Sequence, residues 1–163
     1  MRLLKTLFRK KSTCDEDGGV QTRIDKNAPK SIVSENIISF YCEFSTVAIA
    51  DDIPIEHGIY TFSARLKDGA VRGEYNMRTR YGEGKQFLFR KDHSFMQKLQ
   101  RVVKTYDLAK YNGIEYSVSG LPDMYGAKIH IVYASGESIH TSDNQSNFLP
   151  IEVMQALLEV FKR

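Results

Sequence analysis

Basic side chains recur through residues 65–80 in a pattern that could bind an anion. They alternate with apolar side chains, as in two strands of a hairpin, so the basic ones share one face. Clustered Lys and Arg attract small phosphate-bearing ligands, lipid headgroups and nucleic acid. A merely solvated face, or one that pairs with the acidic residues 35–64, is the alternative interpretation. The predicted anion-binding face consists of Arg65, Lys67, Arg72, Arg78 and Arg80, and Lys85, Arg90 and Lys91 could continue it.

The first eleven residues resemble an interfacial membrane anchor. In a helix, their apolar side chains would lie on one side and their basic side chains largely on the other. So short a helix is not stable alone in water, so we expect it to form only at an interface. The alternatives are a disordered start and a helix packed on its own domain. The candidate contacts with an anionic membrane surface or a protein partner are Leu3, Leu4, Lys5, Leu7, Phe8, Arg9, Lys10 and Lys11.

Other residues that could bind a ligand or take part in catalysis form no complete motif. The stretch from Tyr81 to Lys85 contains two glycines but lacks the spacing of a phosphate-binding loop, and it is better interpreted as a hairpin turn or a flexible loop. A two-residue turn at Ser135-Gly136 would place His130 and His140 on opposite faces, whereas a three-residue loop would bring them together. We therefore predict no catalytic set, no metal site and no cofactor.

Six segments have the apolar alternation or the composition of strands, and two have helical spacing. The predicted strands are 37–48, 59–67, 70–81, 113–120, 127–134 and 138–142, and Asp68-Gly69 joins the second to the third. Asp92 can cap a helix with the apolar stripe Phe95, Met96, Leu99, Val102 and Val103, and Pro150 opens one with Met154, Leu157, Leu158 and Phe161. This order predicts an α+β fold: an antiparallel sheet of about six strands in two βββα passes, with both amphipathic helices on one face.

Composition and charge divide the chain into three parts. The formal net charge is +3, but residues 1–34 hold eight Lys/Arg against four Asp/Glu, which leaves −1 for the remainder. We predict a basic tip at 1–11, a flexible linker at 12–33 and a single domain at 34–163. Two isolated cysteines, and no apolar run long enough to span a membrane, favour a cytoplasmic protein with a peripheral contact at the inner membrane face. The near-neutral domain makes nucleic acid an improbable partner.

The second half contains four short stretches that carry a resemblance: Tyr111-Asn-Gly113, Gly120-Leu-Pro-Asp-Met-Tyr-Gly126, Val132-Tyr-Ala-Ser-Gly-Glu137 and Asp143-Asn-Gln145. Together they resemble an uncharacterised bacterial family, especially of Gram-positive gut organisms, over residues 111–162. The resemblance implies a shared fold and transfers no catalytic role. The sequence thus predicts a non-enzymatic binding or adaptor protein. A small-ligand or anion-binding domain is the alternative, and an enzyme of unknown class is a further one.

Overall fold

The chain forms an α+β fold in which one mixed sheet carries helices on a single face. The computed structural model describes residues 19–49, 52–79, 81–120 and 125–162. Within them lie eight strands, two α-helices and one 3-10 helix, η1. Their bounds are β1 Val20–Ile24, β2 Ile37–Ser45, β3 Ile59–Lys67, β4 Ala70–Arg78, β5 Gly84–Lys91, α1 Ser94–Thr105, η1 Leu108–Tyr111, β6 Ile114–Val118, β7 Ala127–Tyr133, β8 Ser138–Asp143 and α2 Ile151–Lys162.

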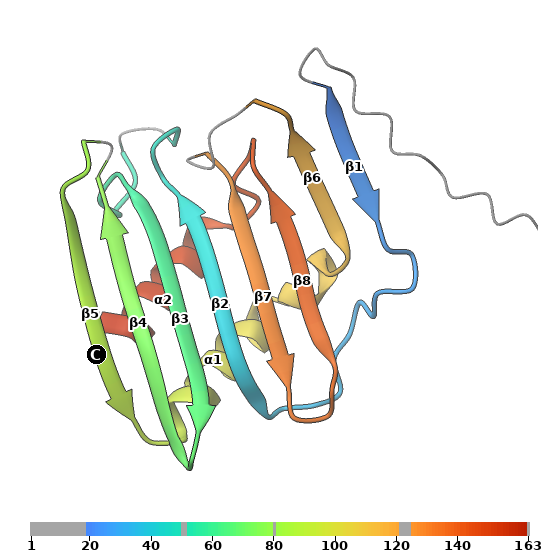
Figure 1. The fold of residues 1–163 in the computed structure, drawn as a ribbon, viewed down its shortest axis with the longest axis vertical. Helices are drawn as coiled ribbons and strands as arrows, with labels where there is room; N and C mark the ends of the chain where they lie inside the picture. Colours follow the sequence, from blue (N-terminus) through green and yellow to red (C-terminus); the bar gives the residue numbers. More distant parts are fainter. Residues whose placement is uncertain (1–18, 50–51, 80, 121–124, 163) are drawn as a thin grey trace, which may run out of the picture.

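The sheet has the strand order β1-β6-β8-β7-β2-β3-β4-β5 (Figure 1). Neighbouring strands are antiparallel except β6 and β8, which run parallel. The strands β2 to β5 form a meander, because each strand pairs with the next one along the chain. By contrast, β6 lies beyond β8, so the chain must pass over the end of β8 to reach β7. The prediction of an antiparallel sheet of about six strands in two βββα passes is therefore partly wrong, because the described residues form eight strands and one of the pairings is parallel.

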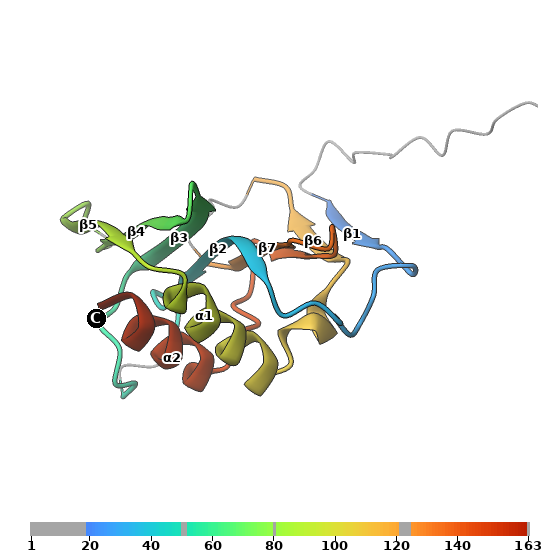
Figure 2. The ribbon, with the colours of Figure 1, turned by 90° about the horizontal axis from the view of Figure 1, so that it is seen from below.

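Both α-helices cover the same face of the sheet (Figure 2). The apolar stripe predicted for the first helix is the buried face of α1, and α2 buries the predicted residues together with Val153. On the sheet side, the alternate residues Phe40, Cys42 and Phe44 of β2 are at most 1% exposed. The α+β class and the two helices on one face are confirmed, because periods of 2 and 3.6 each leave one apolar side that must be covered.

Two strands lie where none was predicted. The five residues of β1 fall inside the predicted linker, and they pair with β6 from Val20↔Val118 to Ile24↔Ile114. The other strand, β5, begins at Gly84, inside the stretch 81–85 predicted as a turn or loop, and pairs with β4. Every residue of β1, and all of β5 except Phe89, is exposed, so neither strand needs the apolar alternation that reveals a half-buried one. The folded domain thus begins ahead of Ser34.

The remaining expectations concern the tip and the membrane. Residues 1–11 and Cys14 lie outside the described residues. None of the helices formed by the described residues is long and apolar enough to cross a membrane.

Candidate functional site

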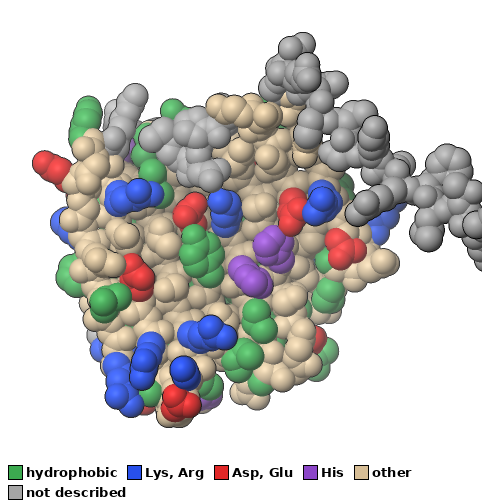
Figure 3. Space-filling model, in the orientation of Figure 1, with side chains coloured by type: hydrophobic (Ala, Val, Ile, Leu, Met, Phe, Trp, Pro, Cys, Tyr) green, Lys and Arg blue, Asp and Glu red, His purple; other side chains and the backbone are tan. Residues whose placement is uncertain are grey.

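The face of the sheet opposite the helices carries the candidate site. Figure 3 shows this open face, on which charged, histidine and hydrophobic side chains are spread over several strands. No described element packs over it, because both helices and η1 lie on the other side (Figure 2). The described helices therefore leave the side chains of this face uncovered.

Three arginines stand directly opposite one another on three adjacent strands of this face. Arg65 of β3 is in register with Arg72 of β4, and Arg72 is in register with Arg90 of β5. All three are exposed, and Lys67 lies two residues from Arg65 on the same face. Opposite residues of antiparallel strands have Cα atoms about 4.5–5.5 Å apart, so the three arginine side chains leave the sheet from adjacent positions. We call Arg65, Arg72 and Arg90 the arginine row.

The turn between β3 and β4 fixes the first two members of this row. Asp68 and Gly69 both have positive φ, 52° and 74°, as a two-residue hairpin turn requires. This turn pairs Lys67 with Ala70, and therefore Arg65 with Arg72. The predicted hairpin is confirmed at this point.

The arginine row differs from Lys128 and Arg23, two other cations on the open face, because it has no acidic partner among the described residues. Lys128 lies 4.0 Å from the Glu43 carboxylate, and Arg23 lies 3.6 Å from that of Glu115. In contrast, the guanidinium groups of the arginine row form no hydrogen bond or ion pair with any residue that the structure describes. Directly opposed like charges are unfavourable across strands. The open face thus keeps one cationic surface uncompensated.

The five residues predicted as an anion site do not all meet. Arg65, Lys67 and Arg72 lie together, but Arg78 is at the far end of β4, where it faces Ile59 and Gly84. Six residues of a strand span about 20 Å, so Arg78 belongs to a different surface. Arg80 lies outside the described residues. Arg90 completes the row, and residues 85–91 carry no apolar alternation that would have placed it there from the sequence.

The two central histidines of the open face are neighbours. His130 of β7 is in register with His140 of β8, and their ring centroids are 5.3 Å apart. The expectation from a two-residue turn is wrong, because Tyr133 N donates to Glu137 O and leaves a three-residue loop in which Gly136 has φ 89°. The Glu115 carboxylate contacts His140 Nε2 at 2.9 Å. Among the described residues, no group of three or more His, Cys, Asp or Glu side chains could hold a metal ion.

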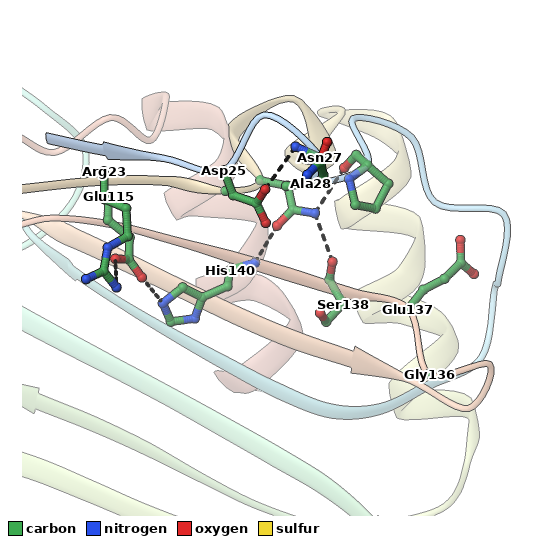
Figure 4. A pocket seen from close by; sticks show the side chains of 12 residues that line it. Arg23, Asp25, Asn27, Ala28, Glu115, Gly136, Glu137, Ser138 and His140 are labelled. Carbon is green, nitrogen blue, oxygen red and sulfur yellow. Dashed lines mark hydrogen bonds and ion pairs between the residues drawn. The ribbon is translucent and has the colours of Figure 1, made fainter. Parts of the chain in front are cut away.

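A hollow of about 480 Å³ lies beside this histidine, at the edge formed by β1, β6 and β8. Figure 4 shows Arg23, Glu115 and His140 at one end, and Asp25, Asn27 and Ser138 further along. The buried Asn112 side chain supports its wall, since Nδ2 donates to Pro29 O and Ser138 O and Oδ1 accepts from His140 N, at 2.8–3.0 Å. These bonds attach the segment that follows β1 to β8. The buried polar groups in the wall of the hollow are therefore explained by a structural role.

The buried nucleophilic and phenolic groups have no catalytic arrangement among the described residues. Burial raises the pKa of the Cys42 thiol, with a smaller contribution from Glu43, so this thiol stays protonated and unreactive. Tyr133 is 1% exposed, and burial with the nearby Glu137 charge raises its pKa to about 12. Its hydroxyl has no hydrogen-bond partner among the described residues. It lines a small crevice of about 180 Å³ between the 31–35 segment and α1.

Comparison with known proteins adds no relative. No protein-family model matches the chain, and no curated protein is significantly similar to it. The resemblance of residues 111–162 to an uncharacterised bacterial family therefore stays a prediction.

Proposed function

We propose that this protein is a non-enzymatic binding protein that attaches reversibly to an anionic membrane surface. The arginine row of the open sheet face makes one contact, and the amphipathic tip at residues 1–11 makes the other. The observation that carries the proposal is the direct register of Arg65, Arg72 and Arg90 without an acidic partner among the described residues. Its proposed place of action is the inner membrane face, because two isolated cysteines favour a reducing compartment.

The arginine row suits phosphate groups in particular. A guanidinium group is always charged and presents a planar set of donors that matches phosphate oxygens in pairs. Three such groups spaced by the strand separation of about 4.8 Å can contact neighbouring phosphates, and an anion relieves their mutual repulsion. Lys67 adds a fourth charge on the same face. The row is therefore better suited to several adjacent phosphates than to a single carboxylate.

A membrane surface fits this face better than nucleic acid does. The open face is broad, and Leu88, which is 75% exposed, shares it two residues from Arg90. Basic side chains beside an exposed apolar one are typical of proteins that lie at a lipid interface. Residues 35–163 have a net charge of −1, with fifteen Lys/Arg against sixteen Asp/Glu, which would weaken binding to a long polyanion.

The energetics explain why two contacts are needed. Each Lys or Arg near an anionic membrane contributes about 1 kcal/mol, so the arginine row and Lys67 together give about 4 kcal/mol. That corresponds to a dissociation constant of about 1 mM. Burial of Leu and Phe side chains of the tip adds apolar free energy. Because both contacts belong to one chain, the second forms at a high effective concentration and strengthens the first.

Vesicle flotation tests the proposal. The full chain is mixed with vesicles of phosphatidylcholine and phosphatidylserine, or of phosphatidylcholine alone. One variant carries Arg65→Gln, Arg72→Gln and Arg90→Gln. Its matched control carries Lys98→Gln, Arg101→Gln and Lys162→Gln, which remove the same charge from the exposed sides of α1 and α2. A third variant carries Leu4→Ser and Leu7→Ser in the tip.

We expect the parent chain and the helix control to float with the phosphatidylserine vesicles only. The arginine-row and tip variants should each lose most of this binding. Equal flotation of the arginine-row variant and the helix control would refute the role of the row. If the row instead binds a soluble ligand, inorganic pyrophosphate will bind the parent chain and not the row variant, while vesicles bind neither. That result would favour a small-anion-binding domain over the membrane proposal.

A further inference from the structure

The outer edge of β5 is the longest unpaired strand edge in the described part of the chain. It is eight residues long, against five for β1 at the other end of the sheet. Figures 1 and 2 show β5 at the rim, with no described element beside its outer side. Two large apolar side chains are exposed there, Phe87 at 55% and Leu88 at 75%. A long edge with exposed apolar residues is suited to pairing with another strand.

The backbone groups available at this edge follow from the β4–β5 turn. Thr79 N donates to Glu83 O at 2.7 Å, and the register from Arg78↔Gly84 to Val71↔Lys91 continues without a bulge. Backbone groups of successive strand residues alternate between the two neighbours of the strand. The odd-numbered residues of β5 therefore direct their N–H and C=O groups to β4. The even-numbered residues Gly84, Gln86, Leu88 and Arg90 direct theirs outward.

A row of aromatic side chains on the helix-covered face of the sheet also ends at the outer edge of β5. Phe62, Tyr75 and Phe87 are in register across β3, β4 and β5, with ring centroids 5.3 and 5.7 Å apart. Helices α1 and α2 reach β5 at Phe89, which contacts Phe95 and Phe161. Phe87 lies beyond this cover and is the exposed end of the aromatic row.

We propose that two copies of this chain pair through the outer edges of β5, antiparallel and about a two-fold axis that passes between the two Phe87 side chains. The axis is perpendicular to the sheet. Each outward-facing residue then meets an outward-facing residue of the second copy, with Gln86 opposite Leu88 and Gly84 opposite Arg90. The two Phe87 side chains form a pair without direct backbone hydrogen bonds, in which side chains approach most closely. The aromatic row thereby continues from one copy into the other.

Opposite charges favour this alignment over the two alignments that are centred on Leu88 and on Gln86. With Phe87 opposite Phe87, Glu83 of each copy lies opposite Lys91 of the other, so two opposite-charge pairs close the ends of the ladder. A shift that centres Leu88 places Lys85 opposite Lys91 twice, and like charges then face each other. The Phe87-centred alignment also places Lys85 opposite Phe89. A shift that centres Gln86 places Phe87 opposite Lys85 and Glu83 opposite Phe89, and so loses both the aromatic pair and the opposite-charge pairs. Only the Phe87-centred alignment among these three joins apolar residues and opposite charges at the same time.

This pairing has a consequence for the arginine rows. An axis perpendicular to the sheet keeps both open faces on one side, so both rows would face the same surface. The dimer stands on the edge geometry alone, whether or not a membrane is the ligand of the row. If it is, two rows bound to one membrane would bind more tightly than one. Eight residues of edge bury less than a standard interface of about 1,600 Å², so we expect a weak dimer.

Cysteine cross-linking of the full chain tests the pairing. In a Cys14→Ser background, Phe87→Cys places two thiols opposite each other, at the separation that a disulfide across a non-hydrogen-bonded pair allows. Leu88→Cys is the matched control, because residue 88 lies opposite residue 86 in the proposed alignment. Cys42 is buried and does not interfere. Under mild oxidation we expect Phe87→Cys to become a covalent dimer much faster than Leu88→Cys.

Charge exchange gives a second, independent readout. Sedimentation at about 100 µM, above the micromolar range expected of a small interface, should show the parent chain as a dimer. Glu83→Lys and Lys91→Glu should each weaken the dimer, and the two together should restore it. A monomeric parent chain, faster cross-linking of Leu88→Cys, or no rescue by the double exchange would each overturn the proposal. A failure of vesicle binding would leave these measurements unaffected, so the two proposals fail separately.

Discussion

The substitution Arg72→Thr should raise the stability of the protein while it weakens anion binding. Arg72 is the central member of the arginine row and faces Arg65 on one side and Arg90 on the other. Two unit charges about 6 Å apart in water repel by roughly 0.7 kcal/mol, and physiological salt screens part of this. Directly opposed like charges on strands cost a similar amount, about 0.2–1 kcal/mol per pair. Removal of Arg72 relieves two such pairs and should stabilise the fold by about 0.5–1.5 kcal/mol.

Arg78→Thr is the matched control for this substitution. It lies on the same strand and the same face, and it is also exposed, but its neighbours are Ile59 and Gly84. The gain in strand propensity from Arg to Thr is therefore common to both variants, while the relief of repulsion is specific to Arg72. We expect Arg78→Thr to change the free energy of unfolding by less than about 0.5 kcal/mol, as surface substitutions usually do.

Urea unfolding at low and high salt measures the effect. At low salt, Arg72→Thr should have the higher urea midpoint. In a thermal scan at the same salt concentration, its Tm should rise by roughly 2–4 °C per kcal/mol for a domain of this size. At about 1 M salt the screening length falls to about 3 Å, so the advantage over the parent chain should largely disappear. A variant less stable than the parent at low salt, or an advantage independent of salt, would refute the electrostatic argument. The arginine row would then be a stabilising part of the sheet.

Three further outcomes follow from buried or bridging polar groups. Asn112→Ala removes three side-chain hydrogen bonds to backbone groups and should lower the free energy of unfolding by about 2–3 kcal/mol in urea titrations. Tyr133→Phe removes a buried hydroxyl without a described partner, so its urea midpoint should equal or exceed that of the parent chain. The Glu137 carboxylate accepts from Val33 N, Ser135 Oγ and Ser34 N, which lower its pKa. The attachment it provides should therefore be complete above the ordinary glutamate pKa of 4.5 and lost as pH falls through the lowered value, and hydrogen exchange at the two amides measures this.

The spacing of apolar residues correctly predicted the helices and strands that have one buried side. The stripe of α1 and the alternation of β2 identify their buried residues correctly, because a helix or strand with one covered face repeats its apolar residues with its own period. The same reasoning could not find β1 and β5, whose side chains are mostly exposed. An edge strand is held by backbone hydrogen bonds to one neighbour, and these leave little trace in side-chain pattern.

The sequence by itself determined that Arg65 and Arg72 share the face opposite the core, because alternation and an Asp-Gly turn are local properties. It also determined which side chains the helices bury. Only the tertiary structure decided that Arg90 completes the row, that Arg78 lies far from it, and that His130 faces His140. Those relations depend on which strands are neighbours and on loop lengths, and a shift of one residue moves a side chain to the other face of the sheet. Strand pairing joins residues distant in the chain, so the spacing of residue types alone does not specify it.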